Sequence, residues 1–508
     1  LRACIEWGYS RLDQPTRQFF AELGVFEGSL SLDSAVAVTG RADAQTMLDM
    51  LSDRSLVAWT AADGAQRYSL LPVVREFALA RLADHQQTLE RRHCEHYLAL
   101  AESLAGRLRG PDWRTAAAGL DADLGNITAA FNFAMGSGHP ALAARLALAL
   151  GEYLPTKGLY SQCLGVAQRA LQVAAGEDQF LRARCLNNVG NAYSRLPTGD
   201  RAQNLTQAIE CYEAALAVWK EDEFPTEWAR THNNLGNAHL WVPTGDRTQQ
   251  ANRAIEHYLA ALRVWQEDRW PTQWATAQNN LGLAYAQMPG GDRAHNLQRA
   301  IEHYQAALRV RTEQHSPIDW AMTQNNLGNA YLLLRAGERE ENLRKAIACY
   351  QAALRVRTES DFPAQWAATQ NNLGSAYSQL VGGDRAENLG RAIACYEAAL
   401  RVWTEADFPA DWAMVQNNLG KAYSDFSVGD RRQNLVRAVD SYTAALRVRT
   451  EADFPAEWAT TQFNLALAWL GLDQKERALE CFERAARGFR TVGLLTEAQE
   501  AEAKAREP

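Results

Sequence analysis

Two adjacent asparagines recur along most of the chain, and their side chains are suited to holding a ligand. Each pair opens a tetrad that reads Asn-Asn-Leu-Gly or a near copy, and successive tetrads are 46 residues apart. They begin at Asn187, Asn233, Asn279, Asn325, Asn371 and Asn417, and the pattern fades at Phe463. A carboxamide offers a hydrogen-bond donor and an acceptor together, so it can pair with a peptide unit whatever side chain that unit carries. This chemistry predicts binding of a protein or peptide.

A third position completes the candidate surface. It lies three residues after the second asparagine, on the same face of a helix. The predicted ligand-binding residues are Asn187, Asn191, Asn233, Asn234, Asn237, Asn279, Asn280, Asn325, Asn326, Asn329, Asn371, Asn372, Asn417 and Asn418. In an alternative interpretation, the asparagine rows bond one another or neighbouring turns and stiffen the array. The second asparagine never varies across seven copies, which fits either interpretation.

Patterns that would indicate an enzyme are missing from the sequence. It contains no Gly-x-x-x-x-Gly-Lys-Ser/Thr phosphate loop, no His-Glu-x-x-His and no Gly-x-Ser-x-Gly. His93 and His96 are three residues apart on a predicted helix, but no second ligand cluster accompanies them. Cys211, Cys349 and Cys395 share one position of the repeat, where packing of a small side chain is the simpler interpretation. We therefore expect no catalytic residue, no metal site and no cofactor.

Composition narrows the class of protein further. The chain has 508 residues, 47% of them hydrophobic and 22% charged, as in ordinary folded proteins. A net charge of -8 argues against a dominant role in binding nucleic acid or a membrane surface, and no apolar run approaches the length of a membrane span. The eight cysteines are scattered without paired spacing, which predicts a cytoplasmic protein. The first residues show neither an initiator Met nor a signal-peptide pattern, so we expect a fragment of a longer protein.

The 46-residue interval indicates one structural unit copied in tandem, and therefore a solenoid. In the copy spanning residues 361–405, Pro363 is suited to a helix start, and a first helix, helix A, is expected over about 364–380. Asp384 is placed to cap a second helix, helix B, with Glu387 completing a capping box. Apolar residues three and four apart give helix B one buried face. Each unit is thus predicted to be a pair of antiparallel helices.

The residues of this unit resemble those of the tetratricopeptide repeat (TPR). In the same copy they are Leu373, Gly374, Tyr377, Ala392, Tyr396 and Ala399. The usual TPR period is shorter by twelve residues. Comparison with the final copy places half of the extra length in the turn between the helices and half in helix B and its link. The resemblance implies that helix A lines a concave surface, where asparagines of peptide-binding members hold the ligand backbone.

Comparison among copies shows where the sequence varies. Helix B and its flanking Gly-Asp-Arg and Phe-Pro elements barely change, whereas two helix A positions do. The variable positions are Arg230, Thr276, Met322, Ala368, Met414 and Thr460, and Trp241, Gln287, Leu333, Gln379 and Asp425. A constant scaffold with one variable face is typical of a ligand-reading array. Few of these residues are charged, so we expect a neutral, polar-to-apolar groove.

The first 86 residues differ from the rest. Helices are predicted over about 1–12, 16–23 and 44–51, followed by strands at 56–59 and 67–70 joined across Ala62-Asp63-Gly64, and by a helix over 72–82. Helices followed by such a hairpin describe a winged helix. The stretches LRACIEWGYSRL, FFAELGVF, LSDRSLV and RYSLLPVVREFA, which start at residues 1, 19, 51 and 67, resemble the winged helix of STAND-class signalling ATPases. That family has the order NTPase, winged helix, TPR-like sensor, so an upstream NTPase domain is an implied partner.

The combined prediction is a mainly α protein, an α-solenoid of extended TPR helix pairs preceded by a small winged-helix domain. The expected domains are a winged helix at 1–86, an irregular TPR-like connector at 87–180, the tandem array at 181–471, and the last repeat with a charged capping helix at 472–508. The predicted function is ligand sensing and autoregulation in a STAND-type ATPase. The alternative is a constitutive TPR scaffold. A third interpretation, DNA binding, is disfavoured because residues 1–90 contain more acidic residues than Arg and no Lys.

Overall fold

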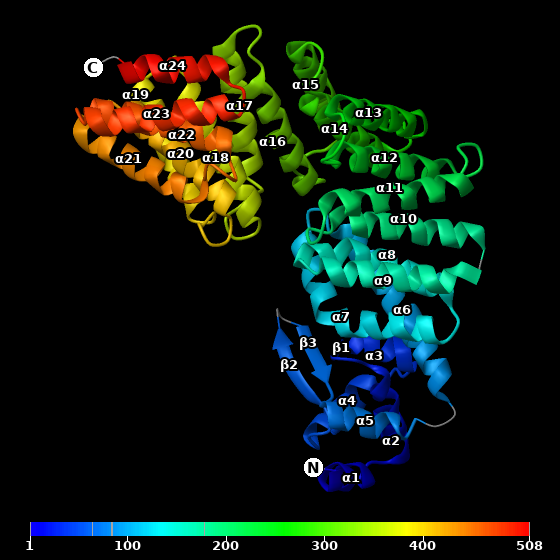
Figure 1. Cartoon of the computed structure of the whole chain (residues 1–508). Helices are drawn as coiled ribbons and strands as arrows, with labels where there is room; N and C mark the ends of the chain where they lie inside the picture. Colours follow the sequence, from blue (N-terminus) through cyan, green and yellow to red (C-terminus); the bar gives the residue numbers. More distant parts are fainter. Residues whose placement is uncertain (1, 63–64, 83–84, 177, 507–508) are drawn as a thin grey trace. The chain divides into compact units, whose positions relative to one another are not determined.

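A computed structural model describes residues 2–62, 65–82, 85–176 and 178–506 of the chain (Figure 1). It forms two compact units, Leu1–Asn280 and Leu281–Pro508, and the boundary between them falls within helix α14 (Pro271–Gln287). The first unit contains the winged helix, the connector and the first repeats. The second unit contains the remaining repeats and the C-terminal helices.

The N-terminal domain is a winged helix, as predicted. Its elements are α1 (Arg2–Ser10), α2 (Gln14–Glu22), β1 (Ser29–Ser31), α3 (Leu32–Thr39), α4 (Ala44–Asp53), β2 (Ala58–Ala62), β3 (Ala65–Ser69) and α5 (Pro72–Leu79). The strands form one antiparallel sheet of order β1-β3-β2, in which Tyr68 is paired with both Leu30 and Trp59. Strand β1 and helix α3 were absent from the prediction. The predicted Asp63-Gly64 turn lies outside the described residues.

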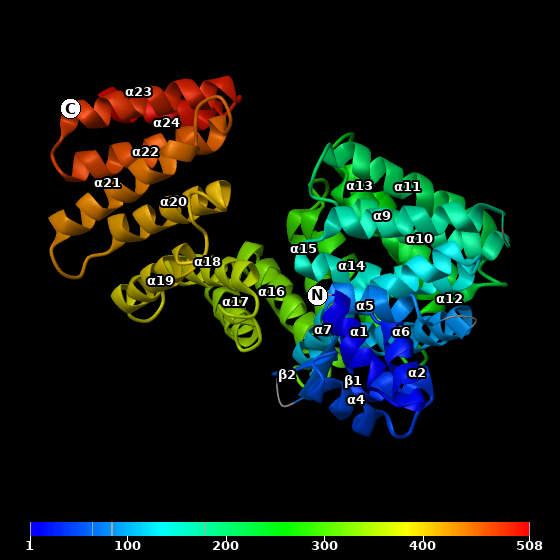
Figure 2. The ribbon, with the colours of Figure 1, turned by 90° about the horizontal axis from the view of Figure 1, so that it is seen from below.

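Among the described residues after the winged helix, all regular elements are helices. The connector consists of α6 (Gln86–Arg107), α7 (Trp113–Gly136), α8 (Pro140–Tyr153) and α9 (Tyr160–Val173). The helices A of the repeats are α10 (Gln179–Arg195), α12 (Pro225–Trp241), α14, α16 (Pro317–Leu333), α18 (Pro363–Gln379), α20 (Pro409–Asp425) and α22 (Pro455–Gly471). The helices B are α11 (Arg201–Val218), α13 (Arg247–Val264), α15 (Arg293–Val310), α17 (Arg339–Leu354), α19 (Arg385–Leu400), α21 (Arg431–Val448) and α23 (Lys475–Thr491). Helix α24 (Leu495–Arg506) ends the array, so the predicted α-solenoid is confirmed (Figures 1 and 2).

Tetrad glycines allow each helix A to approach its helix B. At Gly374 an added Cβ would lie 2.8 Å from Cε1 of Tyr396, a separation that no real side chain tolerates. The same relation holds between Gly420 and Tyr442. The tyrosine ring is fully buried there, as in the other copies. Only glycine leaves room for it, so the Leu-Gly half of the tetrad marks the contact between the paired helices, as predicted.

The Gly-Asp-Arg element closes both helices of a unit. Gly383 takes a positive φ of 83°, which glycine adopts without strain. Oδ1 of Asp384 then accepts hydrogen bonds from the amides of Ala386 (2.9 Å) and Glu387 (3.1 Å), capping helix B as predicted. The capping-box prediction is only half correct, because the carboxylate of Glu387 pairs with Arg391, one turn further along, instead of turning back to the cap.

The arginine of this element has a role that the sequence did not reveal. Nη1 of Arg385 donates hydrogen bonds to the carbonyl oxygens of Ser378 (2.6 Å) and Leu380 (3.1 Å) at the end of helix A. These carbonyls have no partner within the helix, and a cation favours the negative end of the helix dipole. Asn388 adds a hydrogen bond from Nδ2 to the carbonyl of Gly382 (3.1 Å). The extended turn is therefore a compact, fully bonded structure.

Candidate ligand-binding face

Helix periodicity separates a buried and an open side on each helix A. In α12, Arg230 and Trp241 are exposed and Asn234 and Asn237 are half-buried, whereas Asn233 is buried. These open positions recur at three- and four-residue spacing, so they form one stripe along the helix. Successive helices A also contact one another directly, as α16 and α18 and then α18 and α20 do. Within each unit, the stripes therefore lie side by side, and we call this surface the helix-A face.

The first asparagine of each predicted pair lies inside this layer. The side chains of Asn187, Asn233, Asn279, Asn325, Asn371 and Asn417 are buried, with 2 to 9% of the residue surface exposed. The second asparagines are half-buried at Asn234, Asn280, Asn326, Asn372 and Asn418. The two members of a pair therefore occupy different environments, although the sequence gives them the same residue type.

Hydrogen bonds between copies connect the two asparagine rows. Nδ2 of the second asparagine donates to Oδ1 of the first asparagine one copy earlier. The pairs are Asn234 to Asn187 (3.3 Å), Asn280 to Asn233 (3.0 Å), Asn418 to Asn371 (3.1 Å) and Asn464 to Asn417 (3.4 Å). In one copy the acceptor differs, and Asn372 donates to Asn329 (3.0 Å). The rows thus bond one another, as the alternative interpretation expects. Ligand contact by these asparagines stays a prediction.

The third predicted position is also engaged within the repeat. Tyr350 donates a hydrogen bond to Oδ1 of Asn329 at 2.7 Å, and Tyr258 does the same to Asn237 at 2.7 Å. In the first copy, Tyr212 donates to Asn191 at 2.8 Å. This bond satisfies the hydroxyl of a buried tyrosine, which explains why a polar residue stands there in several copies. Sequence reasoning did not identify this tyrosine contact.

One row of polar atoms remains open for a ligand. Within the described part of the chain, Oδ1 of Asn234, Asn372 and Asn418 accepts no hydrogen bond. Nδ2 of each is held by the hydrogen bonds between copies, which we call the asparagine ladder. Anchoring of the nitrogen restricts rotation of each carboxamide and leaves its oxygen unpaired. The helix-A face of the second unit therefore offers hydrogen-bond acceptors at Asn372 and Asn418, suited to peptide N–H groups.

The variable positions surround these acceptors. Met322, Ala368 and Met414 are half-buried on the second unit's helix-A face, and Leu333 is exposed there. This surface agrees with the expected polar-to-apolar character. The first unit differs, because Arg230 stands at the same variable position and carries a charge.

A second set of repeated contacts, between Arg, Trp and Glu side chains, stabilises the packing of the repeat Trp residues. Directly after α19, the Arg401 guanidinium carbon lies 5.1 Å above the ring of Trp366, and the group forms an ion pair with Glu359 at 2.7 Å. The same trio recurs as Arg355, Trp320 and Glu313, and as Arg447, Trp412 and Glu405. The Trp residues are buried, as expected for packing between repeats. Each Arg neutralises the carboxylate and covers the ring, so these charges belong to the scaffold.

A histidine cluster on α12 and α13 was also missed by sequence reasoning. The Nδ1 atoms of His232 and His257 are 2.9 Å apart, and His239 stacks on His257 with 5.4 Å between ring centroids. Burial lowers the pKa of His232 and of His257 to about 4. Among the described residues, no group of three or more His, Cys, Asp or Glu could hold a metal ion. The rings therefore pack as neutral imidazoles.

The winged helix is joined to the connector by buried polar groups. Nη2 of Arg67, on β3, binds Oδ1 of Asp123 on α7 at 2.5 Å and also donates to the carbonyl of Ser29 at 3.1 Å. Asn126 accepts from the amide of Glu27 (2.7 Å) and donates to Ser29 (2.7 Å). Burial of these groups makes each lost bond costly, so the two parts are held as one body.

Comparison with known proteins agrees with this architecture. The family description "MalT winged helix domain" matches residues 7–90, and "Sel1 repeat" matches residues 183–217, 275–309, 321–355, 367–401 and 460–488. The chain is a winged helix followed by TPR-like repeats. Two putative HTH-type transcriptional regulators, one from Mycobacterium tuberculosis and one from Mycobacterium bovis, are 33% identical to it over 156 residues. That match covers 30% of this chain, which spans 18% of the length of these relatives.

Solved structures are similar to this chain in fold alone. The apo quorum sensor NprR from B. thuringiensis has a TM-score of 0.44 and 14% identity, covering 80% of this chain and 98% of its own. A Rap protein complexed with competence and sporulation factor has a TM-score of 0.43 and 10% identity, covering 72% and 96%. None of the described helices combines the length and the apolar character that a membrane span requires.

Proposed function

We propose that the chain is the sensing and autoregulatory region of a STAND-type signalling ATPase. A protein or peptide ligand binds the helix-A face, and the winged helix relays this event to an upstream NTPase domain. The region itself has no catalytic activity and acts in the cytoplasm. The proposal rests first on the chemistry of the helix-A face and second on the junction between winged helix and connector.

The observation that carries the proposal is the row of open carboxamide oxygens. Oδ1 of Asn372 and Asn418 accepts no hydrogen bond among the described residues, while Nδ2 of each donates to an asparagine of the preceding copy. Preorganised acceptors bind an extended peptide without losing side-chain freedom on binding. Met322, Ala368 and Met414 beside them supply an adaptable apolar surface for the ligand's side chains.

Transmission of a binding event from the repeats to an NTPase domain requires a stiff connection, and the junction between the winged helix and α7 supplies one. Gly125 on α7 approaches the chain so closely that an added Cβ would lie 2.6 Å from the carbonyl oxygen of Glu27. Together with the Arg67–Asp123 pair, this contact leaves the domain little freedom to move independently of α7. A change in the connector therefore moves the winged helix with it.

Peptide-library display against the whole chain tests the ligand site. A selected peptide should lose affinity about tenfold when Asn372 and Asn418 are both changed to Ser, because two hydrogen bonds are lost. The matched control changes Gln298 and Gln433, which are exposed on helices B, to Ser. Equal affinity for all three proteins would contradict the proposal.

The rate of ATP hydrolysis by the intact parent protein distinguishes a sensor from a constitutive scaffold. A sensor changes the hydrolysis rate when the selected peptide is added. A constitutive TPR scaffold binds the same peptide without any change in rate. The two functions therefore give opposite results with one reagent.

A further inference from the structure

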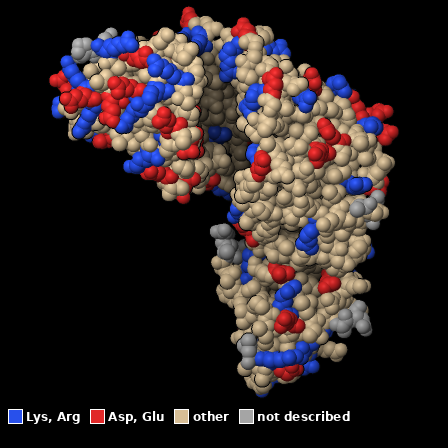
Figure 3. All heavy atoms as spheres, viewed as in Figure 1, with Lys and Arg blue, Asp and Glu red and all other residues tan. Residues whose placement is uncertain are grey.

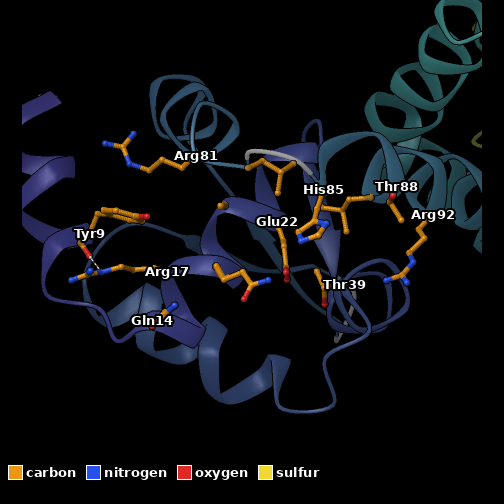
Figure 4. Close-up of a pocket in the computed structure, with 13 residues that line it drawn as sticks. Tyr9, Gln14, Arg17, Glu22, Thr39, Arg81, His85, Thr88 and Arg92 are labelled. Carbon is orange, nitrogen blue, oxygen red and sulfur yellow. Dashed lines mark hydrogen bonds between the residues drawn. The ribbon is translucent and has the colours of Figure 1, made fainter.

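A polar cleft lies in the first unit, away from the helix-A face. It has a volume of about 610 Å³ and is lined by residues of the winged helix and of α6, the first connector helix. Figure 4 shows Tyr9, Arg17 and Arg81 at one end, Thr88 and Arg92 at the other. A cleft of this size matches the volumes of small-ligand sites.

Positive charge gathers on the walls of this cleft. Arg17, Arg81 and Arg92 line it, whereas Glu22 is the one acidic residue among its described lining residues. Both carboxylate oxygens of Glu22 are already bound by Arg41, at 2.7 and 3.0 Å, so Glu22 does not neutralise the cleft. This local excess of guanidinium groups stands against the net charge of -8 of the whole chain.

Two of these arginines retain their charge for a ligand. Arg17 donates to the carbonyl oxygens of Tyr9 (3.2 Å) and Ser10, which are neutral acceptors. Arg92, exposed on α6, has no hydrogen-bond or ion-pair partner in the described part of the chain. Arg81 differs, because it forms an ion pair with Glu6 at 3.0 Å.

Arg17 and Arg92 differ from the arginines near the ends of helices B in their lack of a paired carboxylate among the described residues. There, the exposed arginine near the end of helix B is paired with a carboxylate in several copies, as Arg355 is with Glu313 and Arg401 with Glu359. At the cleft, neutral hydrogen-bonding side chains, Gln14, Gln18 and Thr88, stand beside the unmatched guanidinium groups. Guanidinium groups with neighbouring neutral donors suit an oxyanion with several acceptor oxygens.

We infer that the cleft binds a small molecule that carries a phosphate group, with the phosphate held at Arg92. The ligand contacts residues from the winged helix and from α6 at once. Binding therefore stabilises the junction between them, in addition to any event at the helix-A face. This site is independent of the peptide site and does not require it.

Isothermal titration of the whole chain with pyrophosphate tests the inference. Saturable binding with one site per chain is expected, and Arg92→Gln should weaken it about tenfold, since one charged hydrogen-bonding contact is lost. Arg92→Lys keeps the charge and should weaken binding less. The matched control is Arg91→Gln, because Arg91 is also exposed on α6 but pairs with Glu95 at 3.0 Å.

Two results would overturn the inference: no saturable binding at millimolar pyrophosphate, or equal weakening in Arg91→Gln and Arg92→Gln. Circular dichroism of each variant shows that the fold is retained. Parallel titrations with AMP and inorganic phosphate identify the source of the phosphate. Tighter binding of AMP than of phosphate indicates a nucleotide, and equal affinity indicates an inorganic anion, both at the same site.

Discussion

Asn280 donates a hydrogen bond to Asn233 across 3.0 Å, from one repeat to the one before it. The donor is half-buried and the acceptor buried, so one carboxamide of each pair faces the protein and the other reaches the surface. The two asparagines of a pair therefore differ in burial and in the bonds they make between copies. Their separate contributions can be measured by changing one asparagine at a time.

Substitution of the buried asparagine should destabilise the array. Asn371→Ala removes the acceptor for Asn418 (3.1 Å) and is expected to lower the free energy of unfolding by about 1–3 kcal/mol. Asn372→Ser, at the half-buried position of the same pair, should cost less than half as much. Urea unfolding followed by circular dichroism measures both changes. A larger effect at Asn372 would show that the partially open row carries the structure.

A methyl group at the helix contact should be poorly tolerated. Gly374→Ala places Cβ 2.8 Å from the ring of Tyr396, and the expected loss is about 1–3 kcal/mol from overpacking. Gly390→Ala on α19 is the control, because its Cβ would meet Phe426 only at 3.9 Å. A helix-interior alanine there should raise stability by up to about 1 kcal/mol. Thermal melts should therefore shift in opposite directions.

The winged-helix junction should depend on its buried ion pair. Asp123→Asn leaves Arg67 without a carboxylate and should lower the free energy of unfolding by about 3 kcal/mol. The control is Glu102→Gln, which breaks the exposed pair with Arg145 and should cost less than about 1 kcal/mol. Hydrogen exchange of α7 amides would locate the effect. Equal losses from both changes would argue against a special role for the junction.

Acid should weaken the first unit through its histidine cluster. The pKa values of His232 and His257 are about 4 in the folded protein, against an ordinary value of 6.5, because burial disfavours the charged ring. Below pH 6.5 the unfolded chain binds protons that the folded chain excludes, so stability should fall as the pH drops from 6.5 towards 4. Well above pH 6.5 the histidine rings are neutral in both the folded and the unfolded chain, so this loss of stability is absent.

His257→Cys tests this pH dependence with a residue that the chain itself uses at the same repeat position. The variant should lose less stability than the native chain between pH 6.5 and 4. His295→Cys, at an exposed position of α15, serves as the control. Urea midpoints at several pH values would reveal the difference, and parallel curves for His257→Cys and the native chain would refute the assignment.

Several features that depend on residues close together in the sequence were predicted correctly. The helix pairs, the Asp384 cap and the contact of Gly374 follow from residues within one repeat, so their periodicity sufficed. Strand β1 escaped prediction because it has three residues and pairs with β3 far along the chain, as Leu30 does with Tyr68. A segment that short shows no alternation that could identify it.

Site residues were predicted by type but not by orientation. Carboxamide chemistry singled out the asparagines, yet the ladder depends on the register between copies, which no local pattern records. The cleft was missed for the same reason. Arg17 and Arg92 are far apart in sequence and line one cleft only because α2 and α6 both contribute to its walls.

Charges on the C-terminal helices show the expected character of a capping end. Figure 3 shows acidic and basic side chains interspersed over the visible surface of this part of the chain. Pairs such as Arg484 with Glu480 on α23 contribute to this pattern. A mixed surface of this kind favours solubility over attraction to a single partner of opposite charge.

The Asn280–Asn233 bond has one more consequence, which concerns how such a gene changes. The six copies that begin at Asn187 to Asn417 carry the same donor and acceptor side chains, so removal or duplication of a whole 46-residue module among them leaves matching groups at the new boundary. Unequal recombination between near-identical repeats can therefore lengthen or shorten the array without interrupting the reading frame or the ladder. Evolution can adjust the extent of the helix-A face in whole modules.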